Sequence, residues 1–228
     1  KKIFISHWHG DHVLGLPGLL QTMSASDYQG TLQIYGPRGT RKFMGLMMAA
    51  FMSKTTLQFE LHEVEKCQVT DEETYTVESD NLVHSAVCVG YSFIEKDRRK
   101  INMREIKKRG IPEGPLIGKL QQGMDIMHKG EKIVPDKVSS VIKGRKIVYI
   151  TDTRPCEGAS RLAKDADILI LESTYASDME EKAKEYFHLT AKEAALIASR
   201  ANVKRLILTH FSTRYKQAQT IEEDAREI

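Results

Sequence analysis

Cysteine is scarce in this sequence, and its three residues, Cys67, Cys88 and Cys156, lie far apart. Their odd number and wide spacing argue against a disulfide framework and suit a reducing compartment. The sequence has no Cys-x-x-Cys pair, which argues against a zinc site made of thiolates. Any bound metal would therefore be held by nitrogen and oxygen atoms.

Long apolar runs are also missing. No stretch of eighteen or more apolar residues occurs, which excludes a membrane-spanning helix. The start, KKIFIS, is basic and then apolar, but polar histidines follow at once, so it does not read as a signal peptide. These absences predict a cytoplasmic protein without a membrane partner.

A strong net charge is the third absence, since 34 Lys and Arg nearly balance 31 Asp and Glu. The positive charge is local instead. Residues 95–123 contain nine Lys and Arg against four acidic residues, a net charge of +5, while the rest of the chain is at −2. Such a segment is typical of an element that binds a polyanion, although a solvated basic helix would explain the charge alone.

Apolar runs and turn residues predict an α/β chain. Strands are expected at residues 2–6, 31–35, 59–64, 75–77, 82–93, 146–150, 168–171 and 205–209. Helices are expected at residues 14–23, 40–52, 103–109, 157–164 and 179–201, the last with a break near His188. Residues 110–123 carry four glycines and two prolines, so neither a regular helix nor a central strand is expected there, and the stretch is interpreted as part of an insertion.

Four potential metal ligands lie within six residues in the motif HWHGDH, which follows the apolar run Ile3-Phe4-Ile5. Burying so many imidazole and carboxylate groups without a partner would be costly. In an extended turn, His7 and His9 would face one point, and Asp11 and His12 would turn towards a second point beside it. Nitrogen and oxygen ligands suit Zn²⁺, and two such points would hold two ions about 3.5–4 Å apart.

Further candidate ligands follow predicted strands elsewhere in the chain. Asp152, Glu172 and His210 each lie at or just past the end of a strand, and His84 lies near the start of another. A rigid sheet can bring such side chains to one shared site. Asp152 is the best candidate to bridge two metals, whereas His62 and His128 are interpreted as ordinary histidines.

These residues resemble the metallo-β-lactamase superfamily in its dinuclear zinc branch, on HWHGDH, His84, Asp152 in TDT and His210 in LTHF. The resemblance implies an αβ/βα sandwich with two Zn²⁺ ions at one edge between the sheets. It implies His7, His9 and His84 on one zinc, Asp11, His12 and His210 on the other, and Asp152 between them. Mn²⁺ or Fe²⁺ would accept the same ligands.

A second set of residues resembles the ribonuclease Z family, which processes the 3′ ends of tRNA. GPLIGKL, residues 114–120, is similar to the arm motif of that family, and Glu172 and His188 match two further signatures, here LEST and HLT. Three departures are present: Leu171 replaces a histidine, no lysine follows Leu120, and the family's N-terminal strands are lacking. We therefore expect one metallo-β-lactamase-type domain over residues 1–228, without those strands and with an inserted projecting arm at 95–123.

The resemblance implies a zinc-dependent endoribonuclease that removes 3′ trailers from precursor tRNA by hydroxide attack on a phosphodiester. Asp11 would orient or deprotonate the nucleophile, and His188, steered by Glu172, would be the general acid. The family also forms homodimers, and its arm grips folded tRNA. The arm residues expected to bind substrate are Gly114, Pro115, Gly118, Lys119, Arg98, Arg99, Lys107 and Lys108.

Two alternative functions belong to other classes. The chain could be another hydrolase of the superfamily, such as a small-molecule phosphodiesterase, a β-lactamase or a thioesterase. The arm motif and the basic segment argue against this alternative. It could also be a non-catalytic RNA-binding or scaffold subunit, and the intact ligand set argues against that.

Overall fold

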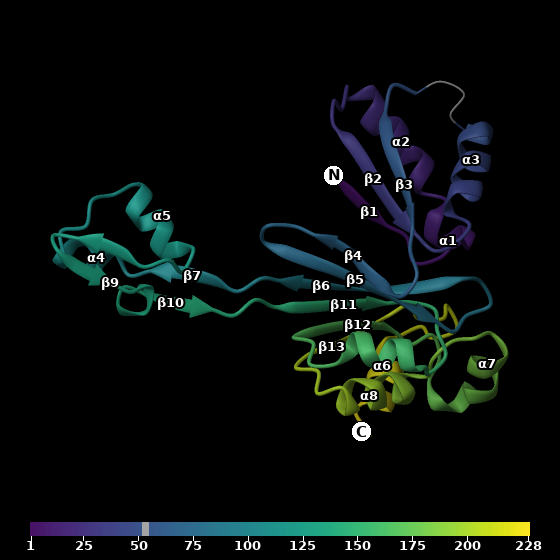
Figure 1. Ribbon diagram of the computed structural model, residues 1–228. Helices are drawn as coiled ribbons and strands as arrows, with labels where there is room; N and C mark the ends of the chain where they lie inside the picture. The colour runs from purple at the N-terminus through teal and green to yellow at the C-terminus, as the bar shows by residue number, and fades with distance from the viewer. Residues whose placement is uncertain (52–54) are drawn as a thin grey trace. The chain divides into compact units, whose positions relative to one another are not determined.

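The computed structural model describes residues 1–51 and 55–228, and the chain divides into two compact units (Figure 1). The first unit contains residues 1–71, 76–94 and 146–228. The second contains residues 72–75 and 95–145. In the described part of the chain, no helix is both long enough and apolar enough to cross a membrane.

A three-stranded parallel sheet begins the first unit. Its strands, in spatial order, are β1 (Lys2–Phe4), β2 (Thr31–Gly36) and β3 (Gln58–Glu63). Parallel neighbours need crossover connections, and these contain α1 (Gly10–Val13), α2 (Leu16–Ala25) and α3 (Thr40–Phe51). Apolar side chains of the sheet and helices form one buried cluster that includes Leu20, Leu32, Ile34 and Met44.

A six-stranded mixed sheet forms the rest of the first unit, in the order β13-β12-β11-β6-β5-β4. The strands are β4 (Cys67–Asp71), β5 (Tyr75–Leu82), β6 (Cys88–Glu95), β11 (Lys146–Ile150), β12 (Ile168–Glu172) and β13 (Leu206–Thr209). Strands β11, β12 and β13 are parallel, so their carboxyl ends meet at one edge. The helices that follow are α6 (Glu157–Ala163), a short 3₁₀ turn (Ser177–Met179), α7 (Glu180–Glu185), α8 (Ala191–Arg200) and α9 (Gln219–Ala225).

The two sheets are joined where β1 meets β6. The Val89 amide donates a hydrogen bond of 3.0 Å to the Ser6 carbonyl, and the Tyr91 hydroxyl donates one of 2.8 Å to the Ile5 carbonyl. The rings of Phe4 and Tyr91 pack edge to face with centroids 5.3 Å apart. Helices α2 and α3 accompany the smaller sheet and α6 and α8 the larger one (Figure 1), so the predicted αβ/βα sandwich is confirmed.

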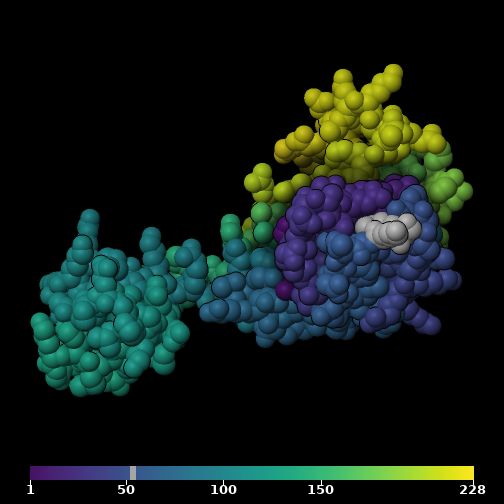
Figure 2. All heavy atoms as spheres, turned by 90° about the horizontal axis from the view of Figure 1, so that it is seen from above, coloured from purple at the N-terminus to yellow at the C-terminus, as the bar shows by residue number. Residues whose placement is uncertain are grey.

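The second unit has a small core of its own, and Figure 2 shows it in teal as a closely packed body. Antiparallel strands β7 (Arg98–Ile101) and β10 (Ser139–Ile142) pair, and β8 (Ile126–His128) and β9 (Glu131–Ile133) form a hairpin. Helices α4 (Met103–Lys108) and α5 (Pro115–Gln121) and a 3₁₀ turn (Pro135–Lys137) complete it. Ile106, Leu120 and Val138 are fully or almost fully buried in the core.

The sequence prediction for residues 110–123 was wrong in one respect, because α5 is a helix within them. Pro115 lies in the first turn of α5. The backbone N–H groups of a first turn have no acceptor within the helix, so proline, which lacks an N–H, is well tolerated there. Gly114, with φ +127, makes the preceding turn that only glycine tolerates. The unit also extends beyond the expected end of the insertion, to residue 145. Residues 95–145 contain fourteen Lys and Arg against seven acidic residues, a net charge of +7, and Glu72 and Glu73 bring the whole unit to +5.

Two other elements differ from their predictions. The expected strand 82–93 is interrupted, because β5 ends at Leu82 and β6 begins at Cys88, and His84 lies in the loop between them. The first helix begins at Gly10, so Asp11 and His12 are helical and not part of an extended turn. The break predicted near His188 in the expected helix 179–201 is confirmed, because α7 and α8 are separated by a loop at residues 186–190. Helix α3 ends at Phe51, and the predicted Met52 lies outside the described residues.

Candidate metal centre

The seven predicted ligand side chains meet at one edge of the sandwich. They come from the segment after β1, the β5–β6 loop, and the ends of β11 and β13. The ligand atoms of His7, His9, His84 and Asp152 all lie within 4.8 Å of one another. The same limit joins a second group, Asp11, His12 and His210.

Asp152 lies between the two groups and contacts both. Its Oδ2 is 3.4 Å from His7 Nε2, 3.7 Å from His84 Nε2 and 3.3 Å from His12 Nε2. Its Oδ1 is 3.4 Å from His210 Nε2. The carboxylate is almost fully buried, so its two oxygens are directed at imidazole nitrogens rather than at solvent.

The donor set fits divalent metal ions. Within the described chain, the buried nitrogens His7 Nε2 and His12 Nε2 have no hydrogen-bond partner. His84 Nε2 and His9 Nδ1 lie 3.1 Å apart. Leaving His7 Nε2 and His12 Nε2 buried and unpartnered is costly, and a cation that accepts their lone pairs would remove this cost. Imidazole nitrogen with carboxylate oxygen is the ligand chemistry of zinc and related metals.

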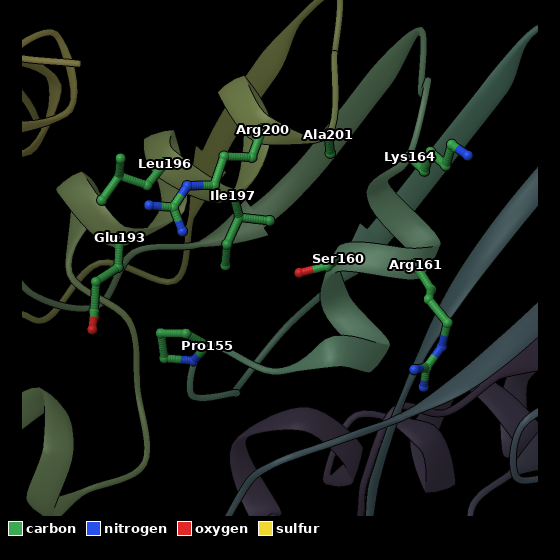
Figure 3. Close-up of a pocket in the computed structure, with 9 residues that line it drawn as sticks. All are labelled: Pro155, Ser160, Arg161, Lys164, Glu193, Leu196, Ile197, Arg200 and Ala201. Carbon is green, nitrogen blue, oxygen red and sulfur yellow. The ribbon is translucent and has the colours of Figure 1, made fainter.

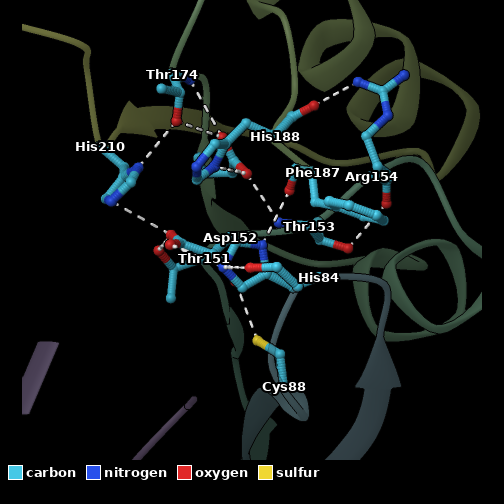
Figure 4. Close-up of polar contacts among 12 residues, drawn as sticks. His84, Cys88, Thr151, Asp152, Thr153, Arg154, Thr174, Phe187, His188 and His210 are labelled. Carbon is cyan, nitrogen blue, oxygen red and sulfur yellow. Dashed lines mark hydrogen bonds and ion pairs between the residues drawn. The ribbon is translucent and has the colours of Figure 1, made fainter. Parts of the chain in front are cut away.

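Neighbouring polar atoms orient several of the ligands. The His84 Nδ1–H donates to a carbonyl, which can only accept, so His84 Nε2 carries the free lone pair. This arrangement fixes ring orientation before any ion binds. Three of the contacts are drawn in Figure 4: His84 Nδ1 to the Phe187 carbonyl (3.1 Å), Thr174 Oγ1 to His210 Nδ1 (2.9 Å) and Thr151 Oγ1 to Asp152 Oδ1 (2.6 Å). The fourth contact joins Ser6 Oγ to His7 Nδ1 (3.1 Å).

The backbone at the site is strained. Asp152, Phe187 and His210 have φ values of +53°, +60° and +61°, in the left-handed region that most side chains avoid. Each such residue costs on the order of 1 kcal/mol and persists only where the surrounding structure holds it. Two of the three are predicted ligand residues, and the carbonyl of the third orients His84.

Burial and nearby charges shift the pKa values of the predicted ligands in different directions. Burial lowers the pKa of His7 to about 4, so its ring is neutral near pH 7 and can donate a lone pair. The Asp152 carboxylate, 3.3 Å from His12 Nε2, raises the pKa of His12. Burial alone would raise the pKa of Asp152, but the adjacent His12 ring and the hydrogen bond from Thr151 outweigh it and hold the pKa well below its usual range.

His188 and Glu172 lie beside this cluster. The His188 Nδ1 is 3.0 Å from Oε1 of Glu172, which is completely buried. The His188 ring centroid is 5.3 Å from those of His84 and His210. Burial lowers the pKa of His188, but the hydrogen bond and the charge of Glu172 outweigh it, and the net shift is upward.

The loop at residues 186–190 is fixed at several points. The Phe187 carbonyl accepts from His84, and the His188 carbonyl accepts from the Arg154 guanidinium. Arg154 also pairs with both carboxylate oxygens of Glu193, at 2.6 and 3.0 Å. Glu193 and Thr190 form the capping box that begins α8. The loop is therefore anchored to the helix that follows it.

Comparison with known proteins identifies the group to which this architecture belongs. A model described as "Beta-lactamase superfamily domain" matches residues 121–211. Ribonuclease Z of Methanothermobacter thermautotrophicus is 43% identical over 230 residues, covering all of this chain and 74% of that protein. Ribonuclease Z of Methanosarcina acetivorans is 40% identical over 233 residues, covering all of this chain and 76% of that protein.

The chain belongs to the ribonuclease Z family. It is thus a member of the metallo-β-lactamase fold and an endoribonuclease, a hydrolase of RNA phosphodiester bonds. The crystal structure of the short form of human tRNase Z superposes with a TM-score of 0.66 at 29% identity, covering 95% of this chain and 74% of that one. The family resemblance found in the sequence is confirmed.

The residues that match the arm motif of the ribonuclease Z family all lie in the second unit. Gly114 precedes α5, and Pro115, Gly118 and Lys119 lie within it. The other four residues predicted to bind substrate are Arg98 and Arg99 on β7 and Lys107 and Lys108 in the last turn of α4. Arg99 forms an ion pair of 2.6 Å with Asp136, so part of its charge is neutralised locally.

The two histidines interpreted as ordinary lie outside the ligand groups. His62 stacks on Tyr35 with centroids 4.7 Å apart, and His128 belongs to the β8–β9 hairpin. A surface hollow of about 510 Å³ is lined by Pro155, Leu196, Ile197 and Arg200 among others (Figure 3). None of the clustered histidines lines it, so it is not part of the metal centre.

Sequence reasoning missed the residues that hold the ligands in place, chiefly Ser6, Thr151, Thr174 and Arg154. One signal was available for Thr174, because it ends the segment LEST that contains Glu172. A similar signal was available for Thr151, which begins the segment TDT that contains Asp152. Ser6 and Arg154 had none, since a hydroxyl or guanidinium beside a ligand is recognisable only once the fold brings the two together.

Proposed function

We propose that this protein is a zinc-dependent endoribonuclease that removes 3′ trailers from precursor tRNA. The observation that carries the proposal is the convergence of seven ligand side chains from distant segments beside the His188–Glu172 pair. Family membership supports the substrate class, since the human relative is described as a tRNase Z.

Two ions would be held by the two ligand groups. His7, His9 and His84 would hold one ion and Asp11, His12 and His210 the other, with Asp152 contacting both. When bound, such ions supply an activated water and neutralise charge on the phosphate oxygens. Zinc suits these ligands best, although Mn²⁺ and Fe²⁺ accept the same set.

Asp11 would orient the attacking water and accept a proton from it. Its side chain is 70% exposed, and Oδ2 lies 3.3 Å from His12 Nε2 and 3.8 Å from His210 Nε2. The carboxylate therefore reaches the second ligand group while staying accessible to solvent and substrate.

His188 would donate a proton to the departing 3′ oxygen. Its Nδ1 is engaged by Glu172, which leaves Nε2 as the atom that can deliver the proton. The raised pKa favours the protonated ring needed for this step. General acid catalysis of this kind is worth about 10²–10⁴ in rate.

The second unit would bind the body of the tRNA. Its net charge of +7 over residues 95–145 suits a phosphate backbone, and contacts to phosphates require no particular sequence. Recognition by shape suits an enzyme whose substrates share a fold and differ in sequence. The residues proposed to contact RNA are Gly114, Pro115, Gly118, Lys119, Arg98, Arg99, Lys107 and Lys108.

The enzyme would act as a homodimer. Large apolar side chains of the first unit are exposed to solvent near and on helices α2 and α3, which is unusual for a surface without a partner. They are Leu14 (68% exposed), Leu19 (48%), Phe43 (41%), Leu46 (59%) and Phe51 (54%). A second copy of the chain is the partner that we propose for them.

The decisive experiment is incubation of the purified protein with a 3′-extended precursor tRNA, with and without a chelator. We expect one product, cut beside the acceptor stem, which disappears on chelation and returns with zinc. A small phosphodiester, a β-lactam and a thioester serve as competing substrates. Turnover of one of these together with intact precursor tRNA would refute the proposal.

A further inference from the structure

Glu172 is a buried carboxylate whose two oxygens contact different partners. Oε1 accepts hydrogen bonds from the Thr153 amide at 2.8 Å and from His188 Nδ1 at 3.0 Å. Oε2 accepts from the amide and the hydroxyl of Thr174, at 3.2 and 2.8 Å. One carboxylate thus holds His188 through one oxygen and Thr174 through the other.

The Thr174 hydroxyl also contacts a metal-ligand residue. Its Oγ1 lies 2.9 Å from His210 Nδ1 (Figure 4). A hydroxyl has a single proton, and an ionised carboxylate can only accept. The Thr174 proton is therefore used by Glu172, and Oγ1 is left to accept the proton of His210 Nδ1.

This chain of hydrogen bonds determines the tautomer of His210. With the proton on Nδ1, the lone pair lies on Nε2, which is 3.4 Å from Asp152 Oδ1 and 3.8 Å from Asp11 Oδ2. The opposite tautomer would direct an N–H into the ligand cluster and could not bind a cation through that atom. The strained backbone of His210 positions the ring but does not select its proton.

We infer that Thr174 is a positioning residue that fixes His210 in the tautomer competent for metal binding. Glu172 then orients His188 directly and His210 through Thr174, so a single carboxylate holds both the general acid and a metal ligand. The effect on cleavage rests on the proposed function, whereas the tautomer and the metal affinity do not depend on any substrate.

The test compares Thr174→Val, which removes the hydroxyl and keeps the shape, with Thr174→Ser, which keeps the hydroxyl. Thr70→Val is the matched control, because Thr70 is a buried threonine whose Oγ1 has no hydrogen-bond partner among the described residues. The first readout is the His210 tautomer in metal-free protein, from two-bond ¹H–¹⁵N NMR couplings at a pH where the ring is neutral. The second is zinc affinity by competition with a chelator.

We expect wild type, Thr174→Ser and Thr70→Val to hold His210 protonated on Nδ1, and Thr174→Val to show the other tautomer in substantial population. Zinc affinity should fall about 10–100-fold in Thr174→Val, and by less than about threefold in Thr174→Ser and Thr70→Val. At saturating zinc, Thr174→Val should lower kcat for precursor tRNA and leave KM unchanged.

Three results would overturn the inference. They are a wild-type His210 protonated on Nε2, equal zinc affinity in Thr174→Val and wild type, and an equal loss in Thr174→Ser and Thr174→Val. The first needs no variant, so it stands even where Thr174→Val does not fold. A wild-type protein that leaves precursor tRNA uncut would refute the proposed function, while the tautomer and zinc measurements would still decide this inference.

Discussion

The histidines of the centre differ in the atoms that hold them. His84 Nδ1 contacts a carbonyl and His7 Nδ1 a hydroxyl, whereas His188 Nδ1 contacts a carboxylate. Burial lowers the pKa of His7 and His84, which keeps their rings neutral. Glu172 reverses the effect of burial on His188 and raises its pKa, so this ring stays protonated to higher pH than an ordinary histidine. Neutral rings suit metal ligands, and a protonated ring suits an acid.

Replacement of His188 tests this separation of roles at the level of one residue. We expect His188→Ala to lower kcat for precursor tRNA by about 10²–10⁴, because the departing oxygen loses its proton donor. Zinc content, measured by atomic emission, should not change. His62→Ala, which removes a histidine outside the ligand groups, should retain wild-type kcat. A His188→Ala enzyme of normal rate would exclude the assignment.

Helix α4 illustrates how local rules build the basic face of the second unit. Asn102 caps its start by accepting from the amides of Arg104 and Glu105, at 3.1 and 3.4 Å. Lys107 and Lys108 lie in its last turn, where cations interact favourably with the helix dipole. Both lysines are exposed, so the helix holds two positive charges at its end in solvent.

Neutralising these two lysines tests RNA binding by this element. Lys107→Gln with Lys108→Gln should weaken binding of precursor tRNA and reduce the slope of log K against log salt by about one for each phosphate that a lysine no longer neutralises. Hydrolysis of a small phosphodiester should be unaffected. The matched control is Lys66→Gln with Lys216→Gln, two exposed lysines of the first unit. Equal weakening in both pairs would show that only overall charge matters.

The ligand types and most elements were predictable because they depend on local sequence. Four potential ligands within residues 7–12 form a dense motif that indicates a metal site, and Asp152 and His210 follow apolar runs that do form strands. The left-handed backbone at Asp152, Phe187 and His210 was not predictable, since it depends on contacts from distant segments. The loop that holds His84 was not predictable either, because it interrupts an apolar run, and neither were the hydroxyl groups that orient the predicted ligands.

At the scale of the whole molecule, the first unit exposes several large apolar side chains near and on α2 and α3. Leu20 and Met44 on the inner faces of these helices are completely buried, whereas Leu19 and Leu46 on the outer faces are 48% and 59% exposed. The inner residues belong to the core of the three-stranded sheet. Leu19 and Leu46 are not part of that core. Their exposed apolar surface is the physical basis for the proposed dimer.

A charge on this surface tests the dimer. Leu46→Asp should convert dimer to monomer in light scattering, because a carboxylate cannot be buried between two apolar faces without a partner. Stability of the monomer should change by less than about 0.5 kcal/mol, since the residue is exposed. Ile207→Asp, on an exposed apolar residue of β13, should leave the dimer intact. A wild-type protein that is monomeric at all concentrations would contradict the proposal.

Two consecutive residues of the loop at 186–190 make contacts at the site. The Phe187 carbonyl orients His84, and the His188 side chain pairs with Glu172. Displacement of this loop would disturb both at once. A compound that displaced the loop would therefore disturb the proposed metal site and the proposed proton donor together, and resistance by a single substitution would be hard to achieve without loss of the enzyme.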